Sequence, residues 1–283
     1  MTQVLIPVIL LGGLTLIFGA FLVFSAEKFK VKKDERVEKI HEILPGIDCG
    51  ACGAPGCAAF AQGVVEGTYA VNGCKAGGVE AADKISEIMG VKNEDTSTEK
   101  VSVLCCLGDK ETAKRIAEYD GISTCEALHL MGGDKGCQYG CLGLGDCVSA
   151  CPFDAIEMGE KGLPYVIEEN CTACGICVET CPRGLFELIP KDQDIYIACR
   201  SYDDARTVKQ VCSRGCTGCT LCTRVTEGGI IEMEGKLAKI QWNKIKDNKM
   251  LEPALEKCPA NTFVKRSELR KKVKGEQLKI NAK

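Results

Sequence analysis

Cysteine is the residue type that most constrains this chain, because 21 of its 283 residues are cysteines. Such a content approaches that of small disulfide-linked secreted domains. Only two histidines are present, His41 and His129, which is too few for Cys2His2 zinc modules and for most histidine-based catalysis. The composition therefore argues against an ordinary hydrolase, and the spacing of the cysteines has to be explained first.

An apolar segment precedes all the cysteines. Residues 2–26 carry no charge, and residues 4–24 would span about 30 Å as a helix, the thickness of a bilayer's hydrocarbon core. Basic residues follow this segment and none precedes it, which predicts a single transmembrane helix over 1–26 in the cell membrane. The N-terminus is then expected outside and the remaining chain in the cytoplasm. A cleavable signal peptide is the alternative, but a basic start and a small-residue cleavage site are missing.

Two runs of cysteines lie in what would be a reducing compartment, where metal or redox cofactors are expected rather than disulfides. The sequence CTACGICVETCP has the bacterial ferredoxin spacing C-x2-C-x2-C-x3-C-P, in which three thiolates hold one 4Fe-4S cluster and the fourth holds its neighbour. The sequence GCQYGCLGLGDCVSACP keeps this order with two insertions. A zinc ribbon, the alternative, uses two separated CxxC knuckles. The expected ligands are Cys137, Cys141, Cys147 and Cys181 for one cluster, and Cys151, Cys171, Cys174 and Cys177 for the other.

A glycine-rich segment before these runs predicts a further 4Fe-4S cluster. Its sequence is LPGIDCGACGAPGCAAF, and its glycines allow the backbone to wrap closely around a compact cofactor. A short helix is expected over 58–65. The expected ligands of this cluster are Cys49, Cys52, Cys57 and Cys74.

The C-terminal cysteines resemble a second ferredoxin pair that has lost one cluster. Thr226 stands where the cross-reaching cysteine of the pair belongs, and no cysteine occurs around Ile245 to Leu251. One cluster is still expected, with Cys216, Cys219, Cys222 and Cys258 as ligands. A local set with Cys212 in place of Cys258 is the alternative.

Five cysteines stay outside these sets: Cys105, Cys106, Cys125, Cys199 and Cys212. Free cysteine often behaves as a small buried apolar residue, which is the simplest interpretation for all five. Ligand exchange or another cluster is the alternative.

These assignments predict an α+β chain of small units that depend on their metal, because units of this size bury little apolar surface. The expected parts are a transmembrane helix (1–26), a charged, helical and solvated linker (27–43), a small helical 4Fe-4S module (44–95), a helical connector (96–133), a ferredoxin-like domain with two 4Fe-4S clusters (134–190), and a degenerate ferredoxin-like domain with one cluster and a basic tail (191–283).

Charge is distributed unevenly between the last two parts. Residues 134–190 carry nine acidic and three basic side chains, whereas residues 191–283 carry twelve acidic and twenty basic ones. Opposite charge steers association, so the basic end is expected to favour an acidic redox partner such as a ferredoxin. A solvated tail, or binding to anionic lipid or nucleic acid, is the alternative interpretation.

The motifs together resemble the B subunits of Rnf complexes, over essentially the whole chain. The resemblance is carried by the apolar N-terminal segment, by CGACGAPGC, and by GCQYGCLGLGDCVSACPFDAI followed by CTACGICVETCPRGLFELIPK. The stretch GCQYGCLGLGDCV is its most specific part, because ordinary ferredoxins lack these insertions. Rnf complexes are membrane-bound ferredoxin:NAD oxidoreductases coupled to ion translocation. Longer members of the family carry a complete second ferredoxin pair.

The resemblance implies an electron-transfer subunit that takes electrons from reduced ferredoxin. Its partners would be the A, D and E membrane subunits, the flavin-bearing G subunit and the NAD-site C subunit of the complex. The sequence has no GxGxxG after a strand, no Walker A motif and no Ser/His/Asp set, so a nicotinamide or flavin site is not expected on this chain. Two other functions compete: a membrane-tethered polyferredoxin that serves another enzyme, and a binding module whose metal is structural. A nucleic-acid partner is not expected.

Overall fold

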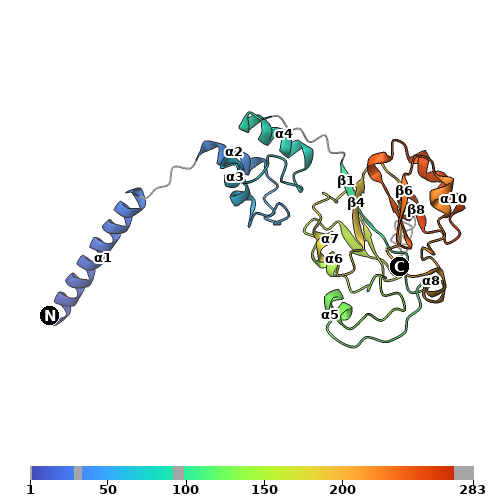
Figure 1. Ribbon diagram of the computed structural model, residues 1–283. Helices are drawn as coiled ribbons and strands as arrows, with labels where there is room; N and C mark the ends of the chain where they lie inside the picture. The colour runs from blue at the N-terminus through green and yellow to red at the C-terminus, as the bar shows by residue number, and fades with distance from the viewer. Residues whose placement is uncertain (1, 29–33, 92–98, 271–283) are drawn as a thin grey trace, which may run out of the picture.

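The computed structural model describes residues 2–28, 34–91 and 99–270 (Figure 1). Helix α1 (Thr2–Lys28) comes first, a helical unit with α2 to α4 follows, and a mixed unit extends from β1 onward. Within the described ranges, no helix meets the length and apolarity required to cross a membrane. Parts of the predicted anchor, linker and tail lie outside the described residues, namely residue 1, residues 29–33 and residues 271–283, and so do residues 92–98. In α1, the side chains of residues 2–11, 26 and 27 are likewise not described.

The helical unit contains α2 (Glu35–Ile43), α3 (Cys57–Val65) and α4 (Gly78–Met89). Helix α3 lies where the sequence predicts a short helix. Helix α2 begins at the N-cap Asp34, whose carboxylate accepts a hydrogen bond from the Arg36 N–H. Its Ile40 is fully buried in the core with Phe60 and Ile85. The second half of the predicted linker is therefore part of this core and is not simply solvated.

The mixed unit consists of two halves with the same strand order. In each half the first and last strands pair antiparallel, and the two middle strands form a hairpin. The first half contains β1 (Lys100–Leu104), α5 (Cys125–Leu130), α6 (Asp146–Ser149), β2 (Ile156–Met158), β3 (Pro164–Val166), α7 (Ile176–Thr180) and β4 (Phe186–Pro190). The second half contains β5 (Ile195–Ile197), α8 (Ala205–Val211), α9 (Leu221–Val225), β6 (Ile231–Glu234), β7 (Leu237–Ile240), the 3-10 helices η1 (Trp242–Lys244) and η2 (Asn248–Leu251), α10 (Glu252–Lys257) and β8 (Phe263–Lys265).

One hydrophobic cluster joins the two halves. In it, Val101 and Ile189 of the paired strands β1 and β4 pack with Tyr196 and Val264 of β5 and β8. A mixed α and β chain is therefore confirmed.

The segment 96–133 differs from the helical connector that was expected. It contains strand β1, which pairs with β4 and so belongs to the first half, and the six-residue helix α5. The carboxylate of Asp109 accepts hydrogen bonds from the N–H groups of Glu111 (2.9 Å) and Thr112 (2.8 Å), which form a turn after β1. The chain after this turn pairs with distant backbone instead of forming a helix, since Ala113 bridges to Cys212 and Arg115 to Lys135.

The C-terminal half has an apolar core where a second cluster of a ferredoxin pair would lie. Leu251 is fully buried, and Trp242, Ile245, Met250 and Leu255 pack in the same cluster. Thr226 is buried, and its hydroxyl donates a hydrogen bond to the Cys222 carbonyl (2.8 Å). Buried apolar side chains therefore supply there the stabilisation that metal supplies elsewhere in such small units.

Candidate iron–sulfur sites

The first site lies in the helical unit. Its pocket is lined by the four expected thiols, together with Pro45, Ile47 and Phe60. The thiols are Cys49, Cys52, Cys57 and Cys74. Burial raises the pKa of the Cys74 thiol, and the three other thiols of the site act in the same direction. Four thiols therefore converge in one weakly solvated place.

Asp48 and two glycines give this site its local shape. The Asp48 carboxylate accepts a hydrogen bond of 2.6 Å from the Cys57 N–H, at the start of α3. A Cβ on Gly56 would lie 2.9 Å from that carboxylate. A Cβ on Gly77 would lie 3.3 Å from the Cys74 sulfur and 2.6 Å from the Ala81 Cβ. Side chains at either glycine would collide with the groups that hold the thiols in place.

The second site differs by one residue from the expected set. Its pocket is lined by Cys125, Cys141, Cys147 and Cys181. Cys137 lies instead in another pocket, with four of the cysteines that had no assigned role. Burial raises the pKa of the Cys147 thiol to about 12, and the thiols of Cys125 and Cys181 act in the same direction.

Two backbone contacts fix Cys125 at the second site. It is the first residue of α5, whose N-cap Thr124 accepts a hydrogen bond from the Ala127 N–H. The Cys125 N–H donates a hydrogen bond of 2.8 Å to the carboxylate of Asp146, the residue before Cys147. The only sequence signal for this residue is the helix-start pattern STCE, since Cys125 lies outside every closely spaced run.

The third site brings together Cys151, Cys171, Cys174 and Cys177. Burial raises the pKa of the Cys177 thiol to about 11, and the three other thiols of the set raise it further. The Ser102 hydroxyl of strand β1 lies 3.2 Å from the Cys177 sulfur. Strand β1, which lies outside the predicted ferredoxin-like domain, therefore contributes to this site.

The fourth site lies in the second half. Its pocket is lined by Cys216, Cys219, Cys222 and Cys258. Cys212, the member of the alternative local set, lines a different pocket. Burial raises the pKa of Cys222 to about 11, and the neighbouring thiol of Cys216 acts in the same direction. Among the 21 cysteines, all of which lie in described ranges, Cys219 is the only exposed one.

The donor sets fit 4Fe-4S clusters, whose ligands in proteins are four cysteine thiolates. At neutral pH, thiols with a pKa of 11 or 12 stay protonated, so iron has to displace their protons on binding. No group of three or more His, Cys, Asp or Glu side chains in the described part of the chain is arranged around a single metal ion.

Comparison with known proteins supports the iron–sulfur interpretation. A family model described as a putative Fe-S cluster matches residues 44–76, and a 4Fe-4S dicluster domain matches residues 136–185. The B subunit of the Na(+)-translocating ferredoxin:NAD(+) oxidoreductase complex of Acetobacterium woodii is 40% identical over 262 residues, which cover 92% of this chain and 78% of the relative. The chain belongs to this B-subunit family. It is an iron–sulfur protein of the 4Fe-4S type, as the sequence predicts.

Other B subunits are similar over comparable lengths. The B subunit of the ion-translocating oxidoreductase complex of Methanosarcina acetivorans is 39% identical, over 86% of this chain and 93% of the relative. The B subunit of the proton-translocating ferredoxin:NAD(+) oxidoreductase complex of Clostridium ljungdahlii is 35% identical, over 84% of each. The relationship to these proteins therefore extends well beyond the two matched iron–sulfur segments.

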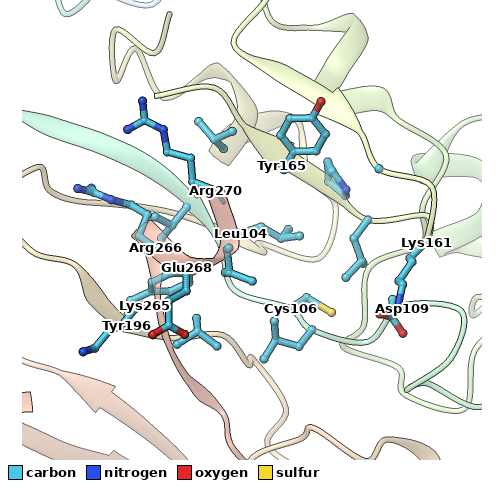
Figure 2. Close-up of a pocket in the computed structure, with 18 of the residues that line it drawn as sticks. Leu104, Cys106, Asp109, Lys161, Tyr165, Tyr196, Lys265, Arg266, Glu268 and Arg270 are labelled. Atoms are coloured by element: carbon cyan, nitrogen blue, oxygen red, sulfur yellow. The ribbon is translucent and has the colours of Figure 1, made fainter. Parts of the chain in front are cut away.

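A pocket larger than those of the first, second and fourth sites lies apart from them. It has a volume of about 770 Å³ and is lined by residues of both halves, including Tyr165, Tyr196 and Arg270 (Figure 2). Arg266 and Arg270 pair there with Glu168 at 2.9 and 3.9 Å. Cys106 is the only cysteine among the described residues that line it. Pocket size is therefore not a guide to the metal sites here.

Proposed function

We propose that this chain is the iron–sulfur subunit that accepts electrons from reduced ferredoxin in a membrane-bound, ion-translocating ferredoxin:NAD oxidoreductase. The observation that carries the proposal is the convergence of sixteen cysteines into four separate sets in a member of the B-subunit family. A bound 4Fe-4S cluster supplies a centre that takes up and gives up one electron. The chain itself holds the thiols, limits their contact with water and directs hydrogen bonds to sulfur.

The proposed ligands follow the four sites, with Cys125 in the second. Backbone N–H groups contact the ligand sulfurs in several of them. The Leu185 N–H lies 3.5 Å from the Cys181 sulfur, and the Thr262 N–H lies 3.4 Å from the Cys258 sulfur. Hydrogen bonds to sulfur and solvent exposure are the means by which a protein tunes the potential of such a centre.

The fourth site is the proposed contact for ferredoxin. Cys219 is exposed there, and the exposed Lys236 lies beside it, since the Lys236 carbonyl is 3.9 Å from the Cys216 sulfur. Arg224 of α9 and Lys257, the residue before Cys258, are exposed as well. A basic rim around the most accessible ligand suits an acidic partner, because opposite charge speeds encounter.

Helix α1 is the proposed membrane anchor. Its described apolar side chains between Leu14 and Phe24 are mostly exposed; Leu16, for example, is 76% exposed. A contiguous exposed apolar surface of this kind favours lipid or a protein partner over water. The other partners proposed are the A, D and E membrane subunits, the flavin-bearing G subunit and the NAD-site C subunit of the complex.

The proposal can be tested on the tagged full-length chain purified from native membranes in mild detergent. Flavin- and NAD-binding subunits should purify with it, and the complex should reduce NAD with electrons from reduced ferredoxin. Cys222→Ala should abolish this activity, whereas Lys39→Ala on the exposed face of α2 should leave it unchanged. Purification with a different redox enzyme, together with intact ferredoxin:NAD activity in cells that lack the chain, would instead support a polyferredoxin serving that enzyme.

A further inference from the structure

We propose that Cys106, Cys137, Cys199 and Cys212 hold a fifth 4Fe-4S cluster, at the junction of the two ferredoxin-like halves. These thiols line one pocket, with Gly108, Gly140 and Ala198 in its wall. Only one of the four, Cys137, belongs to an expected set, and Cys212 belongs only to the alternative local set. The assignment adds to the four sites above and takes no ligand from them.

Both halves contribute ligands to this pocket. Cys106 follows β1, and Cys137 lies in the loop before α6, so these two belong to the first half. Cys199 follows β5 and Cys212 caps the end of α8, so these two belong to the second half. An antiparallel bridge between Ala113 and Cys212 joins the halves at the pocket. The set is therefore assembled by the packing of the halves.

Hydrogen bonds from the backbone reach the sulfurs as they do in the other sites. The Gly108 N–H lies 3.3 Å from the Cys106 sulfur, and the Ser201 N–H lies 3.4 Å from the Cys199 sulfur. Each of these donors is two residues after its cysteine. The Cys106 and Cys199 sulfurs, one from each half, thus have fixed backbone donors, an arrangement that stabilises thiolates around iron.

Glycines keep the space beside the sulfurs open. A Cβ on Gly108 would lie 3.5 Å from the Cys106 sulfur and 3.9 Å from the Cys212 sulfur. A Cβ on Gly140 would lie 3.6 Å from the Cys137 sulfur. Larger side chains at these two positions would extend into the pocket that the thiols surround.

A buried lysine beside the pocket suits an anionic cofactor. Lys135 is only 6% exposed, and its ammonium group donates a hydrogen bond of 2.8 Å to the Gly108 carbonyl. No salt bridge to Lys135 occurs among the residues that the structure describes. A buried cation is costly unless a negative charge lies nearby, and a 4Fe-4S cluster with four thiolates carries about −2 when oxidised.

Cys105 provides a matched contrast, because it borders the same pocket and is nearly fully buried. Its sulfur lies 3.8 Å from the Glu187 carboxylate and packs in the shared core with Val103 and Ile189. The Cys105 side chain is therefore part of the shared hydrophobic cluster and is not a proposed ligand. Twenty of the 21 cysteines then belong to five sets of four, and Cys105 alone remains outside them.

The position of the fifth site links two of the others. The Cys106 sulfur accepts a hydrogen bond of 3.4 Å from the N–H of Cys141, a second-site ligand. The Cys199 sulfur accepts one of 3.3 Å from the N–H of Cys216, a fourth-site ligand. The proposed cluster would thus lie between the second and fourth sites, one hydrogen bond from a ligand of each.

Iron, acid-labile sulfide and zinc should be measured per full-length chain after anaerobic purification. Five clusters give about twenty iron and twenty sulfide atoms in the wild type. The double variant Cys199→Ser/Cys212→Ser should keep about sixteen of each, whereas Cys105→Ser should keep about twenty. A wild type with about sixteen atoms and an unchanged double variant would reject the fifth site and leave the proposed function intact. If the wild type contains zinc and the double variant loses it, the junction pocket binds zinc and the fifth cluster is rejected. Zinc at all sites, without sulfide, would reject both proposals.

A second variant covers the case in which the double variant fails to fold. In Cys212→Ser alone, the serine oxygen can replace one thiolate, so iron content should stay close to wild type while one dithionite-reduced EPR signal and its midpoint potential shift. The same substitution in a purely structural cysteine leaves the EPR spectrum unchanged. An unaltered spectrum and potential for Cys212→Ser would overturn the proposal.

Discussion

Single carboxylates hold the ligand-bearing backbone at two of the sites. The Asp48 carboxylate binds the N–H of Cys57, and the Asp146 carboxylate binds the N–H of Cys125. Neither carboxylate is a proposed ligand. Each acts on a cysteine through the main chain, so its removal should loosen a site without changing its donor set.

Replacement of Asp48 tests this effect. Asp48→Ala removes the acceptor for the Cys57 N–H at the start of α3, a loss that typically costs about 1 kcal/mol. We expect the first site to lose iron to a chelator roughly fivefold faster. Asp48→Asn keeps an acceptor oxygen and tolerates the positive φ of this residue, so it should behave like wild type. Equal rates of iron loss in the two variants would contradict the role of the hydrogen bond.

Pairs of cysteine substitutions test which residues share a cluster. Removal of two ligands of one cluster should cost about four iron atoms, whereas removal of ligands from two clusters should cost about eight. We therefore expect Cys125→Ala/Cys147→Ala to lose about four and Cys137→Ala/Cys147→Ala about eight, as measured by iron and sulfide analysis, because alanine supplies no ligand atom. A loss of only about four iron atoms in the second pair would restore Cys137 to the second site in place of Cys125.

At the scale of the elements, strand pairing decides which segments meet. The pairing of β1 with β4 brings Ser102 to the Cys177 sulfur and places Cys106 at the junction of the halves. In the second half, η2 and α10 supply apolar side chains where a ferredoxin pair would hold its other cluster. The two halves therefore share a strand order and differ in what fills their interiors.

The apolar core of the second half can be tested at Leu251. This side chain is fully buried, so Leu251→Ala should cost about 2 to 5 kcal/mol. The midpoint temperature for loss of the visible iron–sulfur absorbance should fall by roughly 5 to 15 °C. Leu130→Ala is the control, because Leu130 is 81% exposed, and its midpoint should stay close to that of the wild type. An unchanged midpoint for Leu251→Ala would show that metal alone stabilises this half.

At the scale of the whole molecule, charge separates an acidic first half from a basic second half. The basic rim of the fourth site, with Lys236 beside Cys216, lies at the basic end. Long-range attraction of this kind affects the rate of encounter more than the final affinity, and salt screens it.

Charge reversal at this rim tests the ferredoxin contact in the intact complex. Lys236→Glu should raise the KM for ferredoxin several-fold at low ionic strength, with kcat unchanged and with a weaker dependence on salt. Lys39→Glu, on the exposed face of α2 in the helical unit, should leave both constants unchanged. Equal effects of the two substitutions would show that only net charge matters and that ferredoxin docks elsewhere.

The short-range features of this protein could be predicted from its sequence. Closely spaced cysteines followed by proline identify ligands that one loop can present, so the third and fourth sets lie together in the structure as expected. The α3 helix and the α+β character follow from equally local patterns. The prediction of a helical connector was wrong, because pairing with distant backbone, of β1 with β4 and of Ala113 with Cys212, overrides the helical pattern of that segment.

Tertiary structure alone decided which isolated cysteines meet. The second site includes Cys125, sixteen residues before Cys141, and the junction pocket joins Cys106 and Cys212 from different halves. Sequence spacing predicted the ligands that belong to closely spaced runs and those of Cys-Pro pairs such as Cys151 and Cys258. Where strand pairing and the packing of the two halves bring thiols together, the spacing along the chain does not predict that they meet. Their assignment to one site follows from the fold.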